Sequence, residues 1–327
     1  MRNRKIGIIA AIACCCFLTN LSSQESVRWL RSDLLSISHV KDSAVAYVVK
    51  TDQIYSAGMD TLPQIVFWRQ VMNLSPDSGI ISRQGDRTIY AKWSTAAWDK
   101  LGEVKQNAYR DSVRLAHHVP DSVKIYYTAG KNDFYNATAV ITDIHKGVPI
   151  FIQENVDPFY AQAILLIESP GKVRKSNAGA VGSFQLMSGV ARSMGLQVNK
   201  KIDERKDFEK SAWAAAKLIR TTCIPQVNAM LIAKGIELDS ASLWYRLLVL
   251  HTYHAGSGNV SAAMNIIQPT TGGIWLIRRL WVTKAASFGN ASQNYSQLAV
   301  SAMLEMDVAL SKELAMASPP GETVAPK

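Results

Sequence analysis

The sequence predicts a mainly α-helical protein whose second half, residues 151–316, folds as an α-orthogonal domain. Two observations carry this prediction. An almost wholly apolar helix follows Asp157-Pro158, and further helical segments with clear start signals come after it. The turns between these segments are rich in Gly and vary in length. Helices connected in this way surround one buried helix at varied angles and do not form a parallel bundle.

The composition narrows the class of protein. Of the 327 residues, 48% are hydrophobic and 19% charged, which excludes a disordered, collagen-like or coiled-coil chain. Lys and Arg outnumber Asp and Glu by 36 to 26, a formal charge of +10. This balance favours an acidic partner, which is a nucleic acid, an anionic lipid or an anionic glycan. The charge alone does not choose among them.

The first residues predict export. A basic start, Met1–Lys5, is followed by an uncharged apolar run, Ile6–Leu18, and then by small polar residues. The run is shorter than the roughly 20 residues of a membrane-spanning helix. We therefore expect a signal peptide over residues 1–23, and a protein of the periplasm or cell envelope. A second interpretation is cleavage after Ala13 with a lipid on Cys14, which anchors the chain to a membrane.

Removal of residues 1–23 changes the charge and the cysteine content. Three basic residues and no acidic one are lost. This leaves 33 Lys and Arg against 26 Asp and Glu, a net charge of +7. Cys223 is then the single cysteine, so the exported chain has no intramolecular disulfide and no metal site built on several cysteines.

Residues 24–150 predict a smaller region, mixed α/β or mostly helical. The pattern favours helices over Thr61–Leu74 and Ser94–His118, and strands over Arg87–Trp93 and Val123–Tyr127. Thr61 and Gln64 have the spacing of a capping box. The region shows no catalytic pattern. Its aromatic residues are interpreted as packing groups, with a sugar-stacking face as the alternative. They are Trp68, Trp93, Trp98, Tyr126 and Tyr127.

Helix starts in the second half follow from capping residues. Asp157 is an N-cap before Pro158, and the helix that it opens runs to about Ser169. Later helices are predicted after Asp207, from Pro225, after Ser242, from Gly258 and from Asn290. Residues 317–327 form a short Pro-containing tail, predicted to be flexible.

Glu168 is the unusual residue of the first of these helices. It follows the run Ala161–Ile167, which is apolar except for Gln162. The negative end of the helix dipole and apolar walls both disfavour an ionised carboxylate and raise its pKa. A carboxyl group that stays protonated near neutral pH suits a general acid in glycosidic cleavage. The alternative is a carboxylate at a helix end that faces water.

The residues after Glu168 carry a spaced pattern. Glu168-Ser169 and a short loop are followed by Ser176, Gly179, Ala180, Gly182, Gln185 and Met187. This pattern resembles the lytic transglycosylase domain of the soluble lytic murein transglycosylase type, which is related in fold to goose-type lysozyme. The loop before Ser176 is one residue shorter than is usual in that family.

Three later blocks resemble the same family in order. Asp203–Asp207, followed by Ala214–Leu218, is similar to the D-x-R-x-D block and Ala-rich helix of the membrane-bound type D members. Thr252–Val260 is similar to the family's A-Y-N-A-G-x-G-N-V. Asn294-Tyr295 falls where the family has the end of E-T-x-x-Y. The resemblance covers roughly residues 150–310.

The resemblance implies a lysozyme-like fold and a reaction. Glu168 acts as the single acid and base, cleaves the β-1,4 bond between N-acetylmuramic acid and N-acetylglucosamine, and leaves a 1,6-anhydro product. The implied partner is a peptidoglycan strand, and neither cofactor nor metal is implied. A nucleic-acid partner is not expected, because the predicted signal peptide removes the chain from the cytoplasm. The residues implied to support the acid or bind sugar are Ser169, Ser176, Gly182, Gln185, Met187, Tyr253, His254 and Tyr295.

Two positions depart from the family pattern. His254 replaces an Asn, and Ala291 stands where the family has a Glu. They leave open a wall-binding or scaffold protein with a degenerate site, and a lysozyme-like hydrolase is a further alternative. His251 and His254 share a helix face, but the sequence shows no third metal ligand nearby. Residues 24–150 are expected to shape the cleft, dock the domain or bind a cell-envelope protein.

Overall fold

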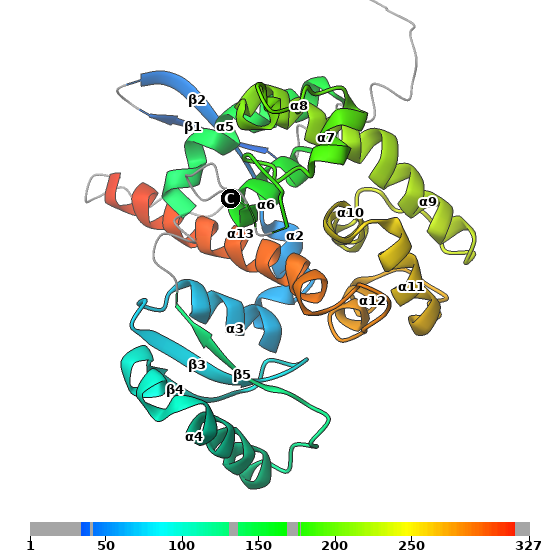
Figure 1. The fold of residues 1–327 in the computed structure, drawn as a ribbon. Helices are drawn as coiled ribbons and strands as arrows, with labels where there is room; N and C mark the ends of the chain where they lie inside the picture. Colours follow the sequence, from blue (N-terminus) through cyan, green and yellow to red (C-terminus); the bar gives the residue numbers. More distant parts are fainter. Residues whose placement is uncertain (1–33, 40–41, 131–136, 169–175, 177, 318–327) are drawn as a thin grey trace, which may run out of the picture.

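The computed structural model describes residues 34–39, 42–130, 137–168, 176 and 178–317. The fold is mainly helical with small sheets in the N-terminal part, as the sequence predicts (Figure 1). The predicted signal peptide, Cys14 and all but the first residue of the predicted tail lie outside the described residues. Within the described part, no helix combines the length and apolar character that crossing a membrane requires.

The described chain begins with a hairpin that the sequence did not predict. Strands β1 (Leu34–His39) and β2 (Asp42–Val49) pair antiparallel, with Leu34 opposite Val49. The short helix α2 (Asp52–Ser56), the 3-10 turn η1 (Met59–Thr61) and helix α3 (Pro63–Met72) follow.

The predicted capping box at Thr61 does not form. Helix α3 starts at Pro63 after Leu62, because proline sets the helical φ at the first position. Thr61 belongs to the preceding turn, and its hydroxyl donates to the Gly58 carbonyl. The Gln64 side chain donates instead to the carbonyl of Gly85.

A three-stranded antiparallel sheet with one helix forms a sheet lobe, residues 78–129. It contains β3 (Ser78–Arg83), β4 (Ile89–Ser94), α4 (Thr95–Ala116) and β5 (Ile125–Ala129), with strand order β4-β3-β5. The predicted helix and both predicted strands are confirmed within a few residues. Ser94 caps α4, since its hydroxyl accepts from the Ala97 amide at 3.1 Å.

The two faces of the sheet pack against different partners. Ile81 lies in a cluster with Trp98 and other residues of α4 and its flanks. Ile80, on the opposite face, packs with Phe67 and Trp68 of α3. Trp98 is 3% exposed and stacks on Tyr127, and Trp68 is 9% exposed. Trp68 and Trp98 therefore serve packing, the favoured interpretation for the aromatic residues.

The described residues between 137 and 317 form a helical body. Its helices are α5 (Ala137–Gln153), α6 (Pro158–Glu168), α7 (Ser188–Met194), α8 (Phe208–Leu218), α9 (Ile224–Ile232), α10 (Leu243–Ala255), α11 (Ser257–Ile267), α12 (Ile274–Leu280) and α13 (Asn290–Ala317). The π-helical turn η3 (Ile219–Cys223) joins α8 to α9. In Figure 1, α13 crosses the middle of the molecule, between the rest of the helical body and α3.

Helix α6 lies at the centre of the helical body. Residues 158–167 are all buried, and the helix packs against α5, α10, α13 and β2. The Asp157 carboxylate accepts from the Phe159 amide at 2.9 Å, which confirms the predicted N-cap. The other carboxylate oxygen of Asp157 pairs with Arg246 of α10 at 2.6 Å, and both side chains are nearly inaccessible. The N-terminal end of α6 is thus fixed to α10.

The buried amide of Gln162 attaches α6 to the hairpin. Its oxygen accepts from the Val49 amide at 2.8 Å, and its nitrogen donates to the Val49 carbonyl at 3.2 Å. This pairing explains the one polar residue in the apolar run.

Helix α5 was not predicted, and it crosses residue 150. Gly147 and Pro149 lie inside it, and both disfavour a helix on local grounds. Tertiary packing overrides them: a Cβ on Gly147 would lie 3.1 Å from Leu165 of α6, so glycine allows the two helices to approach closely. The main core joins residues such as Val48 and Val148. The division at residues 150 and 151 stays a prediction, and the position falls within α5.

Candidate active site

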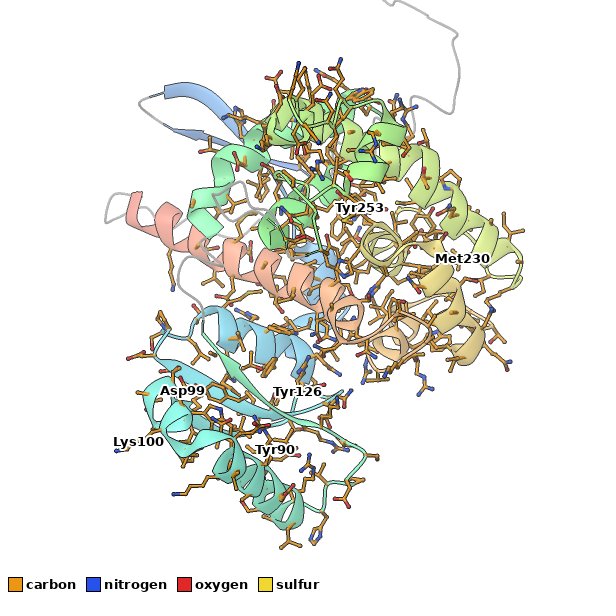
Figure 2. The ribbon with its side chains drawn as sticks, viewed as in Figure 1. Tyr90, Asp99, Lys100, Tyr126, Met230 and Tyr253 are labelled. Atoms are coloured by element: carbon orange, nitrogen blue, oxygen red, sulfur yellow. The ribbon has the colours of Figure 1, made fainter. Side chains whose placement is uncertain are left out.

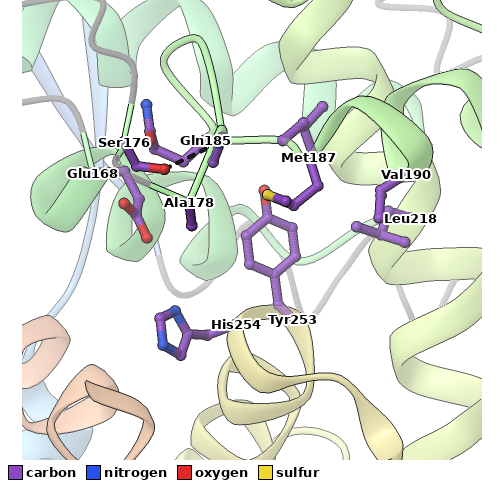
Figure 3. Close-up of a pocket in the computed structure, with 11 residues that line it drawn as sticks. Glu168, Ser176, Ala178, Gln185, Met187, Val190, Leu218, Tyr253 and His254 are labelled. Atoms are coloured by element: carbon purple, nitrogen blue, oxygen red, sulfur yellow. Dashed lines mark hydrogen bonds between the residues drawn. The ribbon is translucent and has the colours of Figure 1, made fainter.

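A cavity of about 290 Å³ opens where α6 ends. Its walls come from the loop between α6 and α7 and from the facing parts of α7, α8 and α10. The described residues that line it are Glu168, Ser176, Ala178, Ala180, Gln185, Leu186, Met187, Val190, Leu218, Tyr253 and His254. In Figure 3, Glu168 and Ser176 lie on one side, Val190 and Leu218 on the other, with Tyr253 and Met187 between them.

Glu168 is the last residue of α6 and the one carboxylate among the described residues that line this cavity. Burial among apolar residues raises the pKa of its carboxyl from 4.5 to about 7, while the nearby Tyr295 hydroxyl acts in the lowering direction. The sequence predicted this upward shift. Near neutral pH the carboxyl is therefore about half protonated, so it can give up a proton and can also accept one.

Tyr295 approaches Glu168 from α13. Its side chain is 3% exposed, and burial together with the neighbouring carboxyl raises the pKa of its hydroxyl well above 10.0. The hydroxyl interacts with the Glu168 carboxyl, but it forms no hydrogen bond of ordinary geometry within the described residues. Tyr295 is thus a buried donor next to the carboxyl that it stabilises in the ionised form.

His254 lies at the end of α10 and faces the cavity. Its ring stacks on Tyr295, with centroids 4.2 Å apart and planes at 20°. The surrounding protein lowers the pKa of the imidazole to about 4, although the side chain remains exposed towards the cavity. At neutral pH, His254 offers a neutral donor and acceptor.

Tyr253 serves the neighbouring loop. Its hydroxyl donates to the Phe184 carbonyl at 2.6 Å, while its ring lines the cavity beside Met187. Burial raises the pKa of this hydroxyl well above 10.0, and the Glu168 charge adds to the effect. Tyr253 therefore holds the loop that forms one cavity wall.

The loop from Ser176 to Met187 is fixed by its own backbone. Ser176 and Ala180 are joined twice, through the Ser176 amide to the Ala180 carbonyl at 2.9 Å and through the Ala180 amide to the Ser176 hydroxyl at 3.0 Å. Val181 and Leu186 exchange two backbone hydrogen bonds of 3.2 Å. The Ser176 hydroxyl thus has a structural partner as well as a place in the cavity wall.

Arg205 ties this loop to the block before α8. Its guanidinium donates to the carbonyls of Gly179 and Leu186 at 3.1 and 3.0 Å, and it is oriented by Asp203 at 2.7 Å. The Arg205 carbonyl lies where a Cβ of Gly182 would be, only 1.9 Å away, and Gly182 has a φ of 89°. Glycine is required at this position because both the space and the left-handed backbone exclude a side chain.

The structure brings most of the predicted site residues together. Ser176, Gln185, Met187, Tyr253 and His254 line the cavity with Glu168. Gly182 shapes the loop and Tyr295 lies behind Glu168; neither is among the described lining residues. Ser169 lies outside the described residues. Contact of these residues with sugar stays a prediction.

Sequence reasoning missed the apolar wall and the role of Arg205. Val190 and Leu218 belong to helices whose apolar positions look like ordinary core positions, so no local signal marks them as cavity residues. Arg205 was part of a matched block, but its contacts with Gly179 and Leu186 join segments that local spacing does not relate.

The cavity limits the chemistry available to it. Glu168 is the one carboxylate among the described lining residues, and residues 169–175 contain no Asp or Glu. Over the parts of the chain that the structure describes, no cluster of three or more His, Cys, Asp or Glu side chains is placed to hold a metal ion. Ala291, at the position of the family's Glu, is exposed in the first turn of α13.

Comparison with known families identifies the central part of the helical body. Residues 152–269 match the family model described as the transglycosylase SLT domain. No curated protein matches the chain. The matched segment contains Glu168, the loop from Ser176 to Met187, and the α10 residues Tyr253 and His254. The resemblance stated from the sequence is therefore confirmed for this segment, which is similar to the transglycosylase SLT domain.

Proposed function

We propose that this protein is an exported lytic transglycosylase that uses Glu168 as its single acid and base. The reaction cleaves the β-1,4 bond between N-acetylmuramic acid and N-acetylglucosamine and leaves a 1,6-anhydro end on the muramic acid. One observation carries the proposal. Desolvation raises the pKa of the partly buried Glu168 carboxyl to about 7, in a cavity whose described lining holds no second carboxylate.

In the first step, protonated Glu168 donates its proton to the glycosidic oxygen. The bond from this oxygen to C1 of the muramic acid breaks, and the N-acetylglucosamine portion leaves with the proton. The acetamido oxygen of the same muramic acid attacks C1 and carries the positive charge as a cyclic intermediate. Because the substrate supplies this nucleophile, the second protein carboxylate of most glycosidases is not needed.

In the second step, the Glu168 carboxylate accepts the proton of the muramic acid 6-hydroxyl. The freed oxygen attacks C1, the bond from the acetamido oxygen to C1 breaks, and the 1,6-anhydro ring closes. Glu168 ends the cycle protonated. A pKa near 7 suits both steps, since neither proton transfer is strongly uphill at neutral pH.

The other cavity residues support this reaction. The Tyr295 hydroxyl stabilises the carboxylate between the steps, because it interacts with the ionised form of Glu168. Gln185, Met187 and His254 provide polar and apolar contacts along the cavity for the sugar rings. The predicted net charge of +7 after export favours a wall polymer that carries lactyl and peptide carboxylates.

The test is the mass of the soluble products. The purified protein is incubated with sacculi, and mass spectrometry is expected to find anhydro-muropeptides that disappear with Glu168→Gln. Glu103→Gln, which removes an exposed carboxylate of α4, is the matched control and is expected to keep the wild-type products. Reducing-end products would instead identify a lysozyme-like hydrolase.

A wall-binding protein is the second candidate, favoured by the departures at His254 and Ala291. It predicts that the protein sediments with sacculi but releases no soluble product at any pH from about 4.5 to 8, a range that spans the Glu168 pKa.

A further inference from the structure

Arg87 is the one buried charge of the sheet lobe, and it faces the helical body. It lies in the turn between β3 and β4, its side chain is 5% exposed, and its φ of 60° is unusual for a residue with a side chain. None of the described carboxylates forms an ion pair with it. Burial lowers the pKa of the guanidinium, but an arginine remains protonated at neutral pH.

The partners of Arg87 lie at the start of α13. One guanidinium nitrogen donates to the side-chain oxygens of Asn294 and Asn290, at 2.7 and 3.1 Å. The cation also lies over three aromatic rings: Phe67 and Trp68 at 5.2 and 5.4 Å, and Tyr126 at 5.5 Å. Figure 2 places Tyr126 on the side of the sheet lobe that is nearer the helical body.

This contact is adjacent to the candidate active site. Asn294 precedes Tyr295, whose hydroxyl interacts with Glu168 and whose ring stacks on His254. The same stretch of α13 is held at Gln297, which accepts from the Trp68 indole at 3.1 Å. The orientation of Tyr295 therefore depends on the first turns of α13, and the sheet lobe and α3 hold those turns.

We propose that Arg87 is a positioning residue, which fixes the start of α13 so that Tyr295 faces the Glu168 carboxyl. This gives part of residues 24–150 a function in the proposed reaction. The proposal rests on the assignment of Glu168 as the reacting group.

The cost of this arrangement supports a role beyond stability. A buried cation that is not paired with a carboxylate is expensive, and an apolar side chain against Phe67 and Trp68 would avoid that cost. The left-handed backbone at Arg87 adds a further penalty for a residue with a Cβ. Unlike an apolar group, the guanidinium donates hydrogen bonds to two polar side chains of α13.

The pKa of Glu168 is the readout, because a purely structural role would leave it unchanged. It is measured by carbon-13 NMR of protein labelled at the glutamate carboxyls, with the Glu168 signal identified by its absence in Glu168→Gln. Among the described residues, the other titratable groups around Glu168 are Tyr253 and His254 on α10 and Tyr295 on α13. The four proteins compared are the wild type, Arg87→Gln, Tyr295→Phe and the double variant.

The Tyr295 hydroxyl lowers the pKa of Glu168, so Tyr295→Phe is expected to raise it. Arg87→Gln is also expected to raise the pKa of Glu168, but by less. In the Tyr295→Phe background, Arg87→Gln is expected to cause no further change in this pKa. With sacculi, kcat is expected to fall on the order of tenfold in Arg87→Gln, with a smaller change in KM, because the reacting group is misplaced. Arg87→Lys keeps the charge but lacks the planar guanidinium. Its Glu168 pKa and its kcat are expected to lie between those of the wild type and those of Arg87→Gln.

Arg69→Gln is the matched control. Arg69 also joins the N-terminal part of the chain to α13, through Glu305 at 2.6 Å, but three turns beyond Tyr295. It is expected to leave the Glu168 pKa in place. The proposal is overturned if Arg87→Gln leaves that pKa unchanged, if it shifts it equally in the Tyr295→Phe background, or if Arg69→Gln shifts it as much.

Two further arms keep the result interpretable. If Arg87→Gln does not fold, Asn290→Ala removes only the more exposed acceptor and is expected to move the pKa in the same direction. The NMR measurement does not require turnover. A wild type that releases no product would therefore refute the proposed function while the positioning role is decided by the pKa values alone.

Discussion

The helical body and the sheet lobe treat ionisable side chains in opposite ways. The helical body contains the buried side chains of Tyr295 and His251 and the partly buried ones of Glu168 and Tyr253. None of the four forms an ion pair within the described residues. In the sheet lobe, every charged side chain except Arg87 is at least partly exposed. Burial moves the pKa values of these four groups of the helical body away from their ordinary values.

This difference shows which parts of the protein accept a loss of stability to hold an ionisable group out of water. Burying a carboxyl costs free energy, so a protein places one in an apolar cavity only where its raised pKa is used. The single buried charge of the sheet lobe, Arg87, reaches out of the lobe to Asn290 and Asn294. The buried charge of the sheet lobe thus lies on the side that faces α13.

The strongest test of this difference between the helical body and the sheet lobe is to remove one carboxyl from each region. Glu168→Gln is expected to lower the release of anhydro-muropeptides by about a thousandfold or more, since it removes both proton transfers. Glu103→Gln in the lobe is expected to stay within about twofold of the wild type, because surface carboxylates far from the cavity contribute little. Product release from sacculi measures both. Comparable losses would show that the two regions do not differ in the proposed way.

A second prediction concerns how tightly the active-site loop is packed. Gly182→Ala is expected to lower the free energy of unfolding by about 2–4 kcal/mol, because the new Cβ meets the Arg205 carbonyl and the backbone φ is positive. Gly179→Ala is the matched control: its φ is 90°, but no atom lies within 4 Å of the added Cβ. Its expected cost is about 1–2 kcal/mol, from the backbone alone. Urea unfolding measures both values, and equal losses would contradict the role of Arg205.

The smallest expected effect is on the pH dependence of stability. The pKa of Glu168 is 4.5 in the unfolded chain and about 7 in the folded one, so the folded state binds more protons between these values. Stability from this group is complete below pH 4.5 and is lost as the pH rises through 7. Relative to the wild type, Glu168→Gln is therefore expected to gain roughly 1–3 kcal/mol between pH 4.5 and pH 8. Unfolding curves across this range test it, and a constant difference would place Glu168 in water.

The sequence predicted the residues of the candidate site better than the residues that hold the site in place. Glu168 could be recognised because a carboxyl after an apolar run is unusual, and Tyr295 and Tyr253 because they stand at matching positions of spaced motifs. Those signals are local. The contacts of Arg205 with Gly179 and of Arg87 with Asn294 join residues far apart in sequence, and no period or cap reports such pairs.

The fold shows the same limit. Capping residues predicted the starts of α6, α8 and α10 because Asp157, Asp207 and Ser242 act within a few residues of themselves. Helix α5 was not predicted because Gly147 and Pro149 disfavour a helix, and its packing on α6, α8 and β2 explains why the helix forms. Local rules fail where tertiary contact outweighs propensity.

The pairing of Gln162 with Val49 has a consequence for association between molecules. The free edge of a two-stranded hairpin presents backbone groups to which a strand of another chain can add. At Val49 both of these groups are already occupied by the Gln162 side chain. A strand that added to this edge of β2 would therefore have to displace the Gln162 side chain of α6 at Val49.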